Sequence, residues 1–287
     1  MQFIMFSKHL APLSIEEAAR RVGEIGFQGL DLTVRQGGHI QPEEVTSRLA
    51  PAVTAVRKLG LDIPMITTNI TSADDAYAAE TFATAAECGI RHLKLGYWHY
   101  RGFGQMQAQL DEVRTSLDGI ARLAERTGVT ANIHIHSEAC LSADAAVVYL
   151  MLKDRDPKQV GAYVDPGHMT VEGGGLGWMM GLDLLSPWLN LVAVKSMAWV
   201  HEYDPELLQE HWRPKMVPLR QGTARWLEVF RCLAQIGYDG IISLHSEYQG
   251  SYSWRDLSTE EVLAQSAEDL AFIKYIAARA KEGQATA

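Results

Sequence analysis

The sequence predicts an α/β fold, a closed (β/α)8 TIM barrel built as a single domain over residues 1–287. Three observations lead to this prediction. Helical segments repeatedly end at a glycine that is followed at once by a short apolar strand. Strands and amphipathic helices alternate along the chain, which is typical of a parallel sheet with right-handed crossovers. No linker or shift in composition divides the 287 residues.

The glycine-to-strand pattern is the clearest repeat in the chain. Glycine just past a helix adopts the left-handed conformation that closes the last turn, and β-rich residues after it start a strand. The helix before the first of these glycines begins at Ser14 and Glu17, which match a capping box. The pattern occurs in EIGFQGLDL (24–32), KLGLDIPMI (58–66), ECGIRHLKL (87–95), RTGVTANIHI (126–135) and QIGYDGIISL (235–244).

The expected strands are numerous enough to close a barrel. The last helix is expected from about Thr259 to Ala280. An open doubly wound sheet is the alternative, but no G-x-G-x-x-G follows any strand. Strands are expected near 2–8, 28–33, 62–68, 91–97, 130–136, 160–165, 190–196 and 240–246.

Composition narrows the class of function. The chain is 47% hydrophobic and 21% charged, and its formal net charge of -9 gives no electrostatic reason to bind nucleic acid or an anionic membrane. The cysteines Cys88, Cys140 and Cys232 are isolated, so a reduced, cytoplasmic setting is expected. The first residues predict a strand and not a signal peptide, and no apolar stretch has the length of a membrane span.

Ionisable residues occur where the predicted strands end. The segment ANIHIHSE ends strand five with His134 and His136, and SLHSEY ends strand eight with His245 and Glu247. Residues two apart in a strand share a face. Because active sites of such barrels lie at the carboxyl ends of the strands, both pairs are expected to point into one mouth.

Strands six and seven add further groups to this mouth. Asp165 ends strand six, with His168 three residues later, and Lys195 ends strand seven. Two histidines and one carboxylate with open positions form a common catalytic metal site, so His134, Asp165 and His245 are the predicted ligands. The alternative is that these are buried polar groups satisfied by hydrogen bonds.

The loops after the strands suit a small polar ligand. Residues 167–181 are glycine-rich and are expected to form a mobile flap whose Trp178 stacks on a sugar face, with a packed surface loop as the alternative. Trp98 and Arg101 after strand four, and His168, are further predicted substrate-binding residues. Arg35, Arg101 and Lys195 are possible partners for a phosphate. No glycine-rich phosphate cradle is present, which favours an unphosphorylated sugar, cyclitol or keto-sugar.

The whole chain resembles the xylose-isomerase-like barrels, the sugar phosphate isomerase/epimerase superfamily that includes ketose 3-epimerases, hydroxypyruvate isomerase, inosose dehydratase and endonuclease IV. The matching phrases are SIEEAARRVGEIGFQGLDL, VDPGH, and the run from VPLRQG to IGYDGIISL, and their order and spacing extend over about 270 residues. The resemblance implies a (β/α)8 barrel, a sugar-like small-molecule substrate, and a homodimer or homotetramer. The zinc cluster and the basic DNA-facing surface that endonuclease IV kinship would require are not visible in the sequence.

In sugar-acting members, one metal is held by a Glu on strand five, an Asp on strand six, a His on strand seven and a Glu on strand eight. Carried over, the aspartate is Asp165, whereas the glutamate positions hold His134 and His245, and the histidine position is Ala193. Only the aspartate keeps its identity. Glu247, the next residue on the same face as His245, is an additional candidate ligand in this scheme.

Two schemes follow from this altered set. In the first, one divalent metal ion polarises a carbonyl, and Glu247, Lys195 or His136 moves the proton, which permits isomerisation, epimerisation or β-elimination. Imidazole ligands favour Mn, Zn, Co or Fe over Mg. In the second scheme the site has lost its metal, and the protein is a sugar-binding barrel without catalysis.

Overall fold

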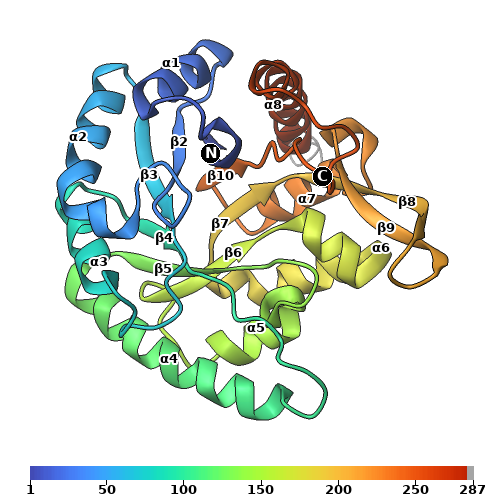
Figure 1. Ribbon diagram of the computed structural model, residues 1–287, viewed down its shortest axis with the longest axis horizontal. Helices are drawn as coiled ribbons and strands as arrows, with labels where there is room; N and C mark the ends of the chain where they lie inside the picture. Colours follow the sequence, from blue (N-terminus) through green and yellow to red (C-terminus); the bar gives the residue numbers. More distant parts are fainter. Residues whose placement is uncertain (283–287) are drawn as a thin grey trace.

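The computed structural model describes residues 1–282 and contains the closed eight-stranded barrel that the sequence predicts (Figure 1). Every pair of neighbouring barrel strands is parallel. The order around the barrel is β1-β10-β7-β6-β5-β4-β3-β2, so strands follow the chain and the last closes on the first. The strands are β1 (Gln2–Phe6), β2 (Gly29–Thr33), β3 (Asp62–Thr67), β4 (His92–Lys94), β5 (Thr130–His134), β6 (Val160–Val164), β7 (Leu189–Val194) and β10 (Ile241–Leu244).

Helices surround the barrel on its outer side, one after each barrel strand (Figure 1). Within residues 1–282, none of them combines the length and the apolar character that crossing a membrane requires. The helices are α1 (Ile15–Ile25), α2 (Val45–Lys58), α3 (Ala78–Glu87), α4 (Met106–Thr127), α5 (Ala145–Leu152), α6 (Pro166–Leu185), α7 (Trp226–Gln235) and α8 (Thr259–Glu282). Short 3-10 helices are η1 (Lys8–Leu10), η2 (Pro42–Glu44), η3 (Leu141–Ala143), η4 (Ser186–Trp188) and η5 (Leu219–Gln221).

The glycines that the sequence places between helix and strand have the predicted conformation. At Gly26, which follows α1, φ is 102° and the amide donates to the carbonyls of Gly23 and Val22. A positive φ of this kind is strained for other residues, which explains why glycine recurs there. The other four also have positive φ: Gly60, Gly89, Gly128 and Gly237.

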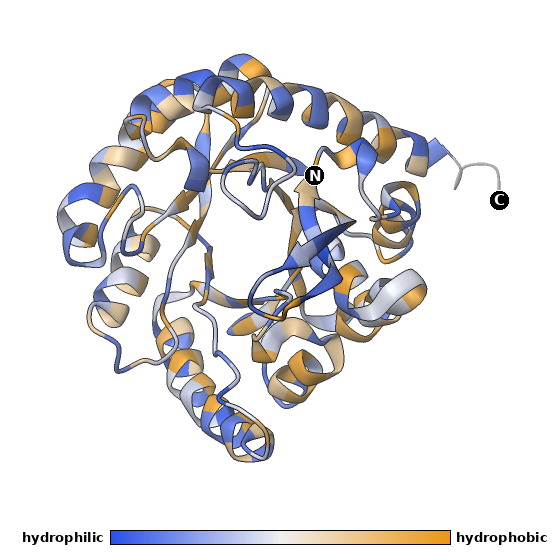
Figure 2. Cartoon of the chain, turned by 45° about the vertical axis from the view of Figure 1, so that its right-hand side comes forward, coloured by the Kyte–Doolittle hydropathy of each residue, from blue (hydrophilic) through white to orange (hydrophobic). Residues whose placement is uncertain are grey.

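The apolar residues form two separate layers. The larger core fills the space between the strands and the surrounding helices, and bands of hydrophobic and hydrophilic residues alternate along those helices (Figure 2). Inside the barrel lies a smaller cluster from five strands, made of Ile4, Met65, Tyr163, Leu191, Ala193 and Ile241. This inner cluster closes the barrel beneath the carboxyl ends of the strands, so the barrel is a packed core and not a pore.

A buried polar layer lies between this apolar cluster and the mouth of the barrel. Asp31 of β2 is fully buried and accepts hydrogen bonds from Thr67 Oγ1 at 2.7 Å and Ser243 Oγ at 3.0 Å. The Tyr163 hydroxyl lies 3.4 Å from the same carboxylate. These bonds join β2, β3, β6 and β10 across the barrel and make a rigid floor for the groups above.

The prediction of a flap over residues 167–181 is wrong. These residues belong to α6, which is broken only at Gly174, where φ is 63° and ψ is -152°. Trp178, Leu182 and Leu185 are buried and recur at helical spacing, so they anchor α6 in the core. The glycines suggested a loop, but burial of this apolar face outweighs their low helix propensity.

The long segment after strand seven forms a two-stranded antiparallel hairpin. Its strands are β8 (Ser196–Asp204) and β9 (Gln209–Val217). The hairpin extends away from the barrel beside α6 (Figure 1). Met197, Pro214 and Met216 at its base contribute to the wall of the barrel mouth.

A buried carboxylate on α8 gives a testable dependence of stability on pH. Asp269 is 1% exposed and accepts from the Leu219 amide at 3.0 Å and from the Tyr248 hydroxyl. Burial raises the pKa of Asp269 from 3.8 to about 6, although these hydrogen bonds oppose the rise. The folded protein therefore binds this proton more tightly than the unfolded chain, and the stabilisation present below pH 3.8 is lost as pH rises through 6.

Asp269→Asn is expected to remove this dependence while keeping an acceptor for the Leu219 amide. The free energy of unfolding of the wild type, minus that of the variant, should fall by about 3 kcal/mol between acid and neutral pH. Urea unfolding of both proteins at a series of pH values measures this difference. A difference that does not change with pH would show that the carboxylate ionises normally.

Candidate active site

The predicted ionisable residues meet at the carboxyl end of the barrel. His134 is the last residue of β5, Asp165 follows β6 as the N-cap of α6, and His245 follows β10. Lys195 follows β7, and Glu247 lies two residues beyond His245. All five are buried, with side chains converging from four strands. The alternation of strand side chains therefore positions them as the sequence predicts.

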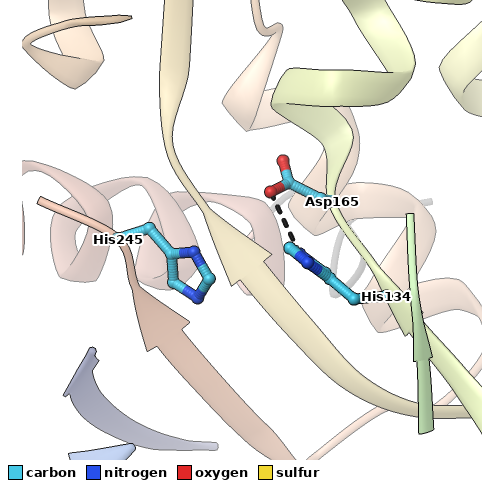
Figure 3. Close-up of side chains that lie close together, drawn as sticks. All are labelled: His134, Asp165 and His245. Carbon is cyan, nitrogen blue, oxygen red and sulfur yellow. Dashed lines mark ion pairs between the residues drawn. The ribbon is translucent and has the colours of Figure 1, made fainter. Parts of the chain in front are cut away.

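Three of these side chains form a compact set of ligand atoms (Figure 3). His134, Asp165 and His245 each offer one atom, and these atoms all lie within 4.8 Å of one another. His134 Nε2 is 3.3 Å from Asp165 Oδ2. Within the described residues, His134 Nε2, Asp165 Oδ2 and His245 Nδ1 are buried and have no hydrogen-bond partner. Unpaired buried polar atoms are costly, and a bound cation would satisfy all three.

Tyrosine hydroxyls fix the orientation of both imidazoles. Tyr97 Oη is 2.8 Å from His134 Nδ1, and Tyr163 Oη is 2.8 Å from His245 Nε2. In each ring, the other nitrogen is left free to face the triad. Burial, followed by the charge of Lys195, holds the pKa of both histidines well below the usual value, so both are neutral. Neutral imidazoles held through the second nitrogen are typical of metal ligands.

A buried network of charges borders the triad. Lys195 Nζ lies 3.0 Å from Glu247 Oε2 and 3.4 Å from Asp165 Oδ2, and Lys8 Nζ donates to Glu247 Oε1 at 2.7 Å. Burial alone would lower the pKa of Lys195, but the charges of Glu247 and Asp165 outweigh it and raise the pKa. Burial likewise opposes ionisation of Glu247, yet Lys195 and Lys8 hold its pKa well below the usual value. Both groups are therefore charged.

Two further histidines lie beside this network. His136 Nδ1 is 2.9 Å from the Ser137 carbonyl, and His168 Nδ1 is 2.6 Å from the Ser137 hydroxyl. Since a carbonyl only accepts, Nδ1 of His136 carries the proton and Nε2 is the free acceptor. The two imidazole rings are 4.1 Å apart between centroids.

The site is a narrow inner cavity beneath a wider outer one. The inner cavity has a volume of about 70 Å³ and is lined by His134, His245, Tyr97 and Tyr163 among others. The outer cavity, of about 220 Å³, includes His168 and the base of the β8–β9 hairpin. Lys8, His136, Lys195 and Glu247 line both. A larger hollow of about 520 Å³ lies between α5 and α6, but it has no histidine or lysine and is separate from this site.

The remaining predicted substrate-binding residues lie elsewhere. Trp178 is fully buried in the core, so the prediction that it stacks on a sugar is wrong. Trp98 packs against the hydrophobic core, and Arg101 pairs with Glu112 at 2.6 Å on the surface. Neither Trp98 nor Arg101 lines the two cavities of the mouth.

Sequence reasoning missed several residues that line the inner cavity, among them Lys8, Lys94, Tyr97 and Tyr163. Lys94 and Tyr163 face into the barrel, as strand alternation would have shown for the residues that share a face with His92 and Asp165. Lys8 lies two residues beyond the end of β1, and Tyr97 lies three residues beyond the end of β4. No periodicity separates them from ordinary loop residues.

Comparisons with known proteins agree with the fold. A comparison with curated protein sequences finds no match. Among solved structures, 3-keto-D-glucoside 4-epimerase from E. coli has a TM-score of 0.70 at 16% identity, covering 96% of this chain and 99% of that chain. L-ribulose 3-epimerase has a TM-score of 0.72 at 18% identity, covering 99% and 97%. The probable 3-DHS dehydratase from Bacillus anthracis has a TM-score of 0.68 at 16% identity, covering 94% and 99%.

At these identities the structures establish the shared fold alone. The comparison with protein families is more specific. The family described as "Xylose isomerase-like TIM barrel" matches residues 19–276. This range includes seven of the eight barrel strands and the whole triad. The chain belongs to the xylose isomerase-like TIM barrel family.

Proposed function

We propose that the protein is a metal-dependent enzyme of the isomerase or epimerase kind, acting on a ketose, cyclitol or keto-sugar by moving a proton beside a carbonyl. The observation that carries this proposal is the triad of His134, Asp165 and His245, whose free ligand atoms are buried and lie within 4.8 Å of one another. The sugar epimerases among the structural neighbours support the reaction class.

The triad suits one divalent ion that prefers imidazole ligands. Two neutral imidazoles and one carboxylate leave open positions for substrate, and they favour Mn, Zn, Co or Fe over Mg. When bound, such an ion polarises the substrate carbonyl and makes the neighbouring C–H more acidic. Tyr97 and Tyr163 keep the histidine ligands in place through hydrogen bonds of 2.8 Å.

Proton transfer is assigned to the residues that line both cavities. The general base is His136, whose free Nε2 accepts the proton from the substrate. The buried ammonium of Lys195 balances negative charge that develops on the substrate oxygen, and Glu247 holds this ammonium in place at 3.0 Å. His168, in the outer cavity, is a hydrogen-bond partner for substrate hydroxyls.

Two other functions use the same cavity. A lyase would remove the same proton and then expel a leaving group at the β carbon, for which the outer cavity of about 220 Å³ gives room. The dehydratase among the neighbours supports this second choice. Incubation with ketoses in D2O separates the two, because an epimerase incorporates deuterium without loss of water or alcohol.

A metal-free sugar-binding barrel is the third function. The observation in its favour is Lys195 Nζ at 3.4 Å from Asp165 Oδ2, because this ammonium already supplies a positive charge beside the triad. In such a protein the triad would bind hydroxyl groups directly. The metal content of the purified protein separates this function from the enzyme.

The wild type is expected to contain close to one metal ion per chain when purified without chelator or affinity nickel. His245→Ala should lose most of it, because one of three ligands is gone. Mass spectrometry of bound metals measures both, and His92→Gln, a change in a histidine outside the triad on β4, is the matched control. Absence of metal from the wild type after soaking with Mn and Zn would favour the metal-free barrel.

A further inference from the structure

Two basic side chains at the inner cavity form no ion pair with any residue of the described part of the chain, 1–282. Lys94, the last residue of β4, is 2% exposed, and its Nζ has no hydrogen-bond partner among the described residues. Arg35 follows β2 and is half-buried, and over residues 1–282 its guanidinium forms no ion pair. Both line the inner cavity. An unpaired buried charge is costly, so this arrangement is unusual for a residue with only a structural role.

The carboxylates of the site are already engaged by other groups. Glu247 is bound by Lys8 at 2.7 Å and Lys195 at 3.0 Å. Asp31 accepts from Thr67 and Ser243 in the polar layer below. Burial first, and then the charge of Arg35, hold the pKa of Lys94 well below the usual value, so both effects disfavour its charged form. A bound anion would offset both effects and favour the charged ammonium of Lys94.

Each cation rests on an aromatic ring that contacts a triad histidine. Lys94 Nζ is 3.4 Å from the centroid of the Tyr97 ring, whose hydroxyl bonds to His134. The Arg35 guanidinium carbon is 5.7 Å from the centroid of Phe6, whose ring stacks on His245 at 4.5 Å between centroids. These contacts place the positive charges one ring away from the triad.

Lys94 and Arg35 also lie across the barrel from Lys195 and Glu247. β2, β3 and β4 are neighbours in the barrel order, and β7, which leads to Lys195, is opposite β3. A substrate with its carbonyl at the triad would therefore meet Lys195 and Glu247 on one side and Lys94 and Arg35 on the other.

We propose that Lys94 and Arg35 bind a carboxylate of the substrate, so that the substrate is a keto-sugar acid rather than a neutral sugar. This proposal rests on the proposed function and specifies its substrate class. The planar guanidinium and the ammonium match the two oxygens of a carboxylate. The inner cavity, at about 70 Å³, holds a small group of this kind close to the reacting carbon.

Matched pairs of ligands test the proposal without turnover. The probes are 2-keto-D-gluconate against D-fructose and 5-keto-D-gluconate against L-sorbose, because each pair differs only in a carboxylate in place of a hydroxymethyl group. By calorimetry, the wild type should bind at least one acid about tenfold more tightly than its neutral partner. Lys94→Met and Arg35→Gln should each reduce this ratio toward one without weakening binding of the neutral sugar.

The control is Lys58→Met, which removes an exposed ammonium at the end of α2 and should keep the full preference. Arg35→Gln keeps the test decisive if Lys94→Met does not fold. Equal binding within both pairs, or binding of neither acid, would overturn the proposal. Inorganic phosphate that binds more tightly than either acid, and loses affinity in both variants, would replace the carboxylate with a phosphorylated substrate.

Failure here is distinguishable from failure of the proposed function. Binding is measured with metal-loaded and with chelator-treated protein. A preference for acids in a protein that takes up no metal would overturn the proposed enzyme and leave the anion site. Metal uptake and deuterium incorporation into neutral ketoses, without a preference for acids, would do the reverse.

Discussion

Asp165→Asn is expected to lower the affinity for Mn²⁺ by about 100-fold and to abolish deuterium incorporation into the substrate. Asp165 is the only anionic member of the triad, and its Oδ2 is the atom that faces His134 at 3.3 Å. A neutral carboxamide is a much weaker ligand for a divalent ion. Loss of the Asp165 charge also leaves Lys195 with a single carboxylate partner, so the ammonium repels the ion more strongly.

The variant should fold normally, which makes the result interpretable. Asp165 Oδ1 caps α6 by accepting from the His168 amide at 3.1 Å, and asparagine is an equally good N-cap. Calorimetric titration with Mn²⁺ measures the affinity. Asp269→Asn removes another buried carboxylate outside the barrel mouth and is the matched control. Unchanged affinity in Asp165→Asn would contradict the ligand assignment.

The barrel was predictable because its signals are local. Five of the eight barrel strands follow a glycine whose positive φ closes a helix, as at Gly26 and Gly128, and this requirement is visible without any tertiary contact. The triad was predictable for a related reason. His134, Asp165 and His245 end barrel strands, and the fold alone brings the ends of parallel strands to one mouth.

Residues whose positions depend on tertiary packing were not predictable in the same way. The glycines around Trp178 predict a flap, yet burial of its indole with Leu182 and Leu185 stabilises a helix there. Tyr97 contacts His134 through a loop geometry that no sequence period encodes. Lys94 was predictable only in part. Strand alternation indicates that its side chain faces into the barrel, but not that its Nζ has no hydrogen-bond partner among the described residues.

The charge of Lys195 separates the metal-dependent enzyme from the metal-free barrel. An ammonium at 3.4 Å from Asp165 Oδ2 repels a divalent ion bound to that carboxylate. If the ion binds there, the ammonium has another role. In the proposed mechanism, this role is to stabilise negative charge on the substrate oxygen. Metal binding and catalysis should therefore respond to Lys195 in opposite directions.

Lys195→Met is expected to raise the affinity for Mn²⁺ by about tenfold and to lower the rate of deuterium incorporation by about 1,000-fold. The affinity rises because a competing positive charge is removed from beside Asp165 and Glu247. The negative charge of these carboxylates then attracts the ion more strongly. The rate falls because no buried ammonium balances the charge that forms during proton removal.

A purely structural lysine would lower both quantities together, since two unpaired buried carboxylates would disorder the site. Calorimetry with Mn²⁺ and deuterium incorporation followed by mass spectrometry measure the two effects, with Lys58→Met as the control for loss of a lysine. Weaker Mn²⁺ binding in Lys195→Met would contradict the opposition of charges, and an unchanged rate would remove Lys195 from the mechanism.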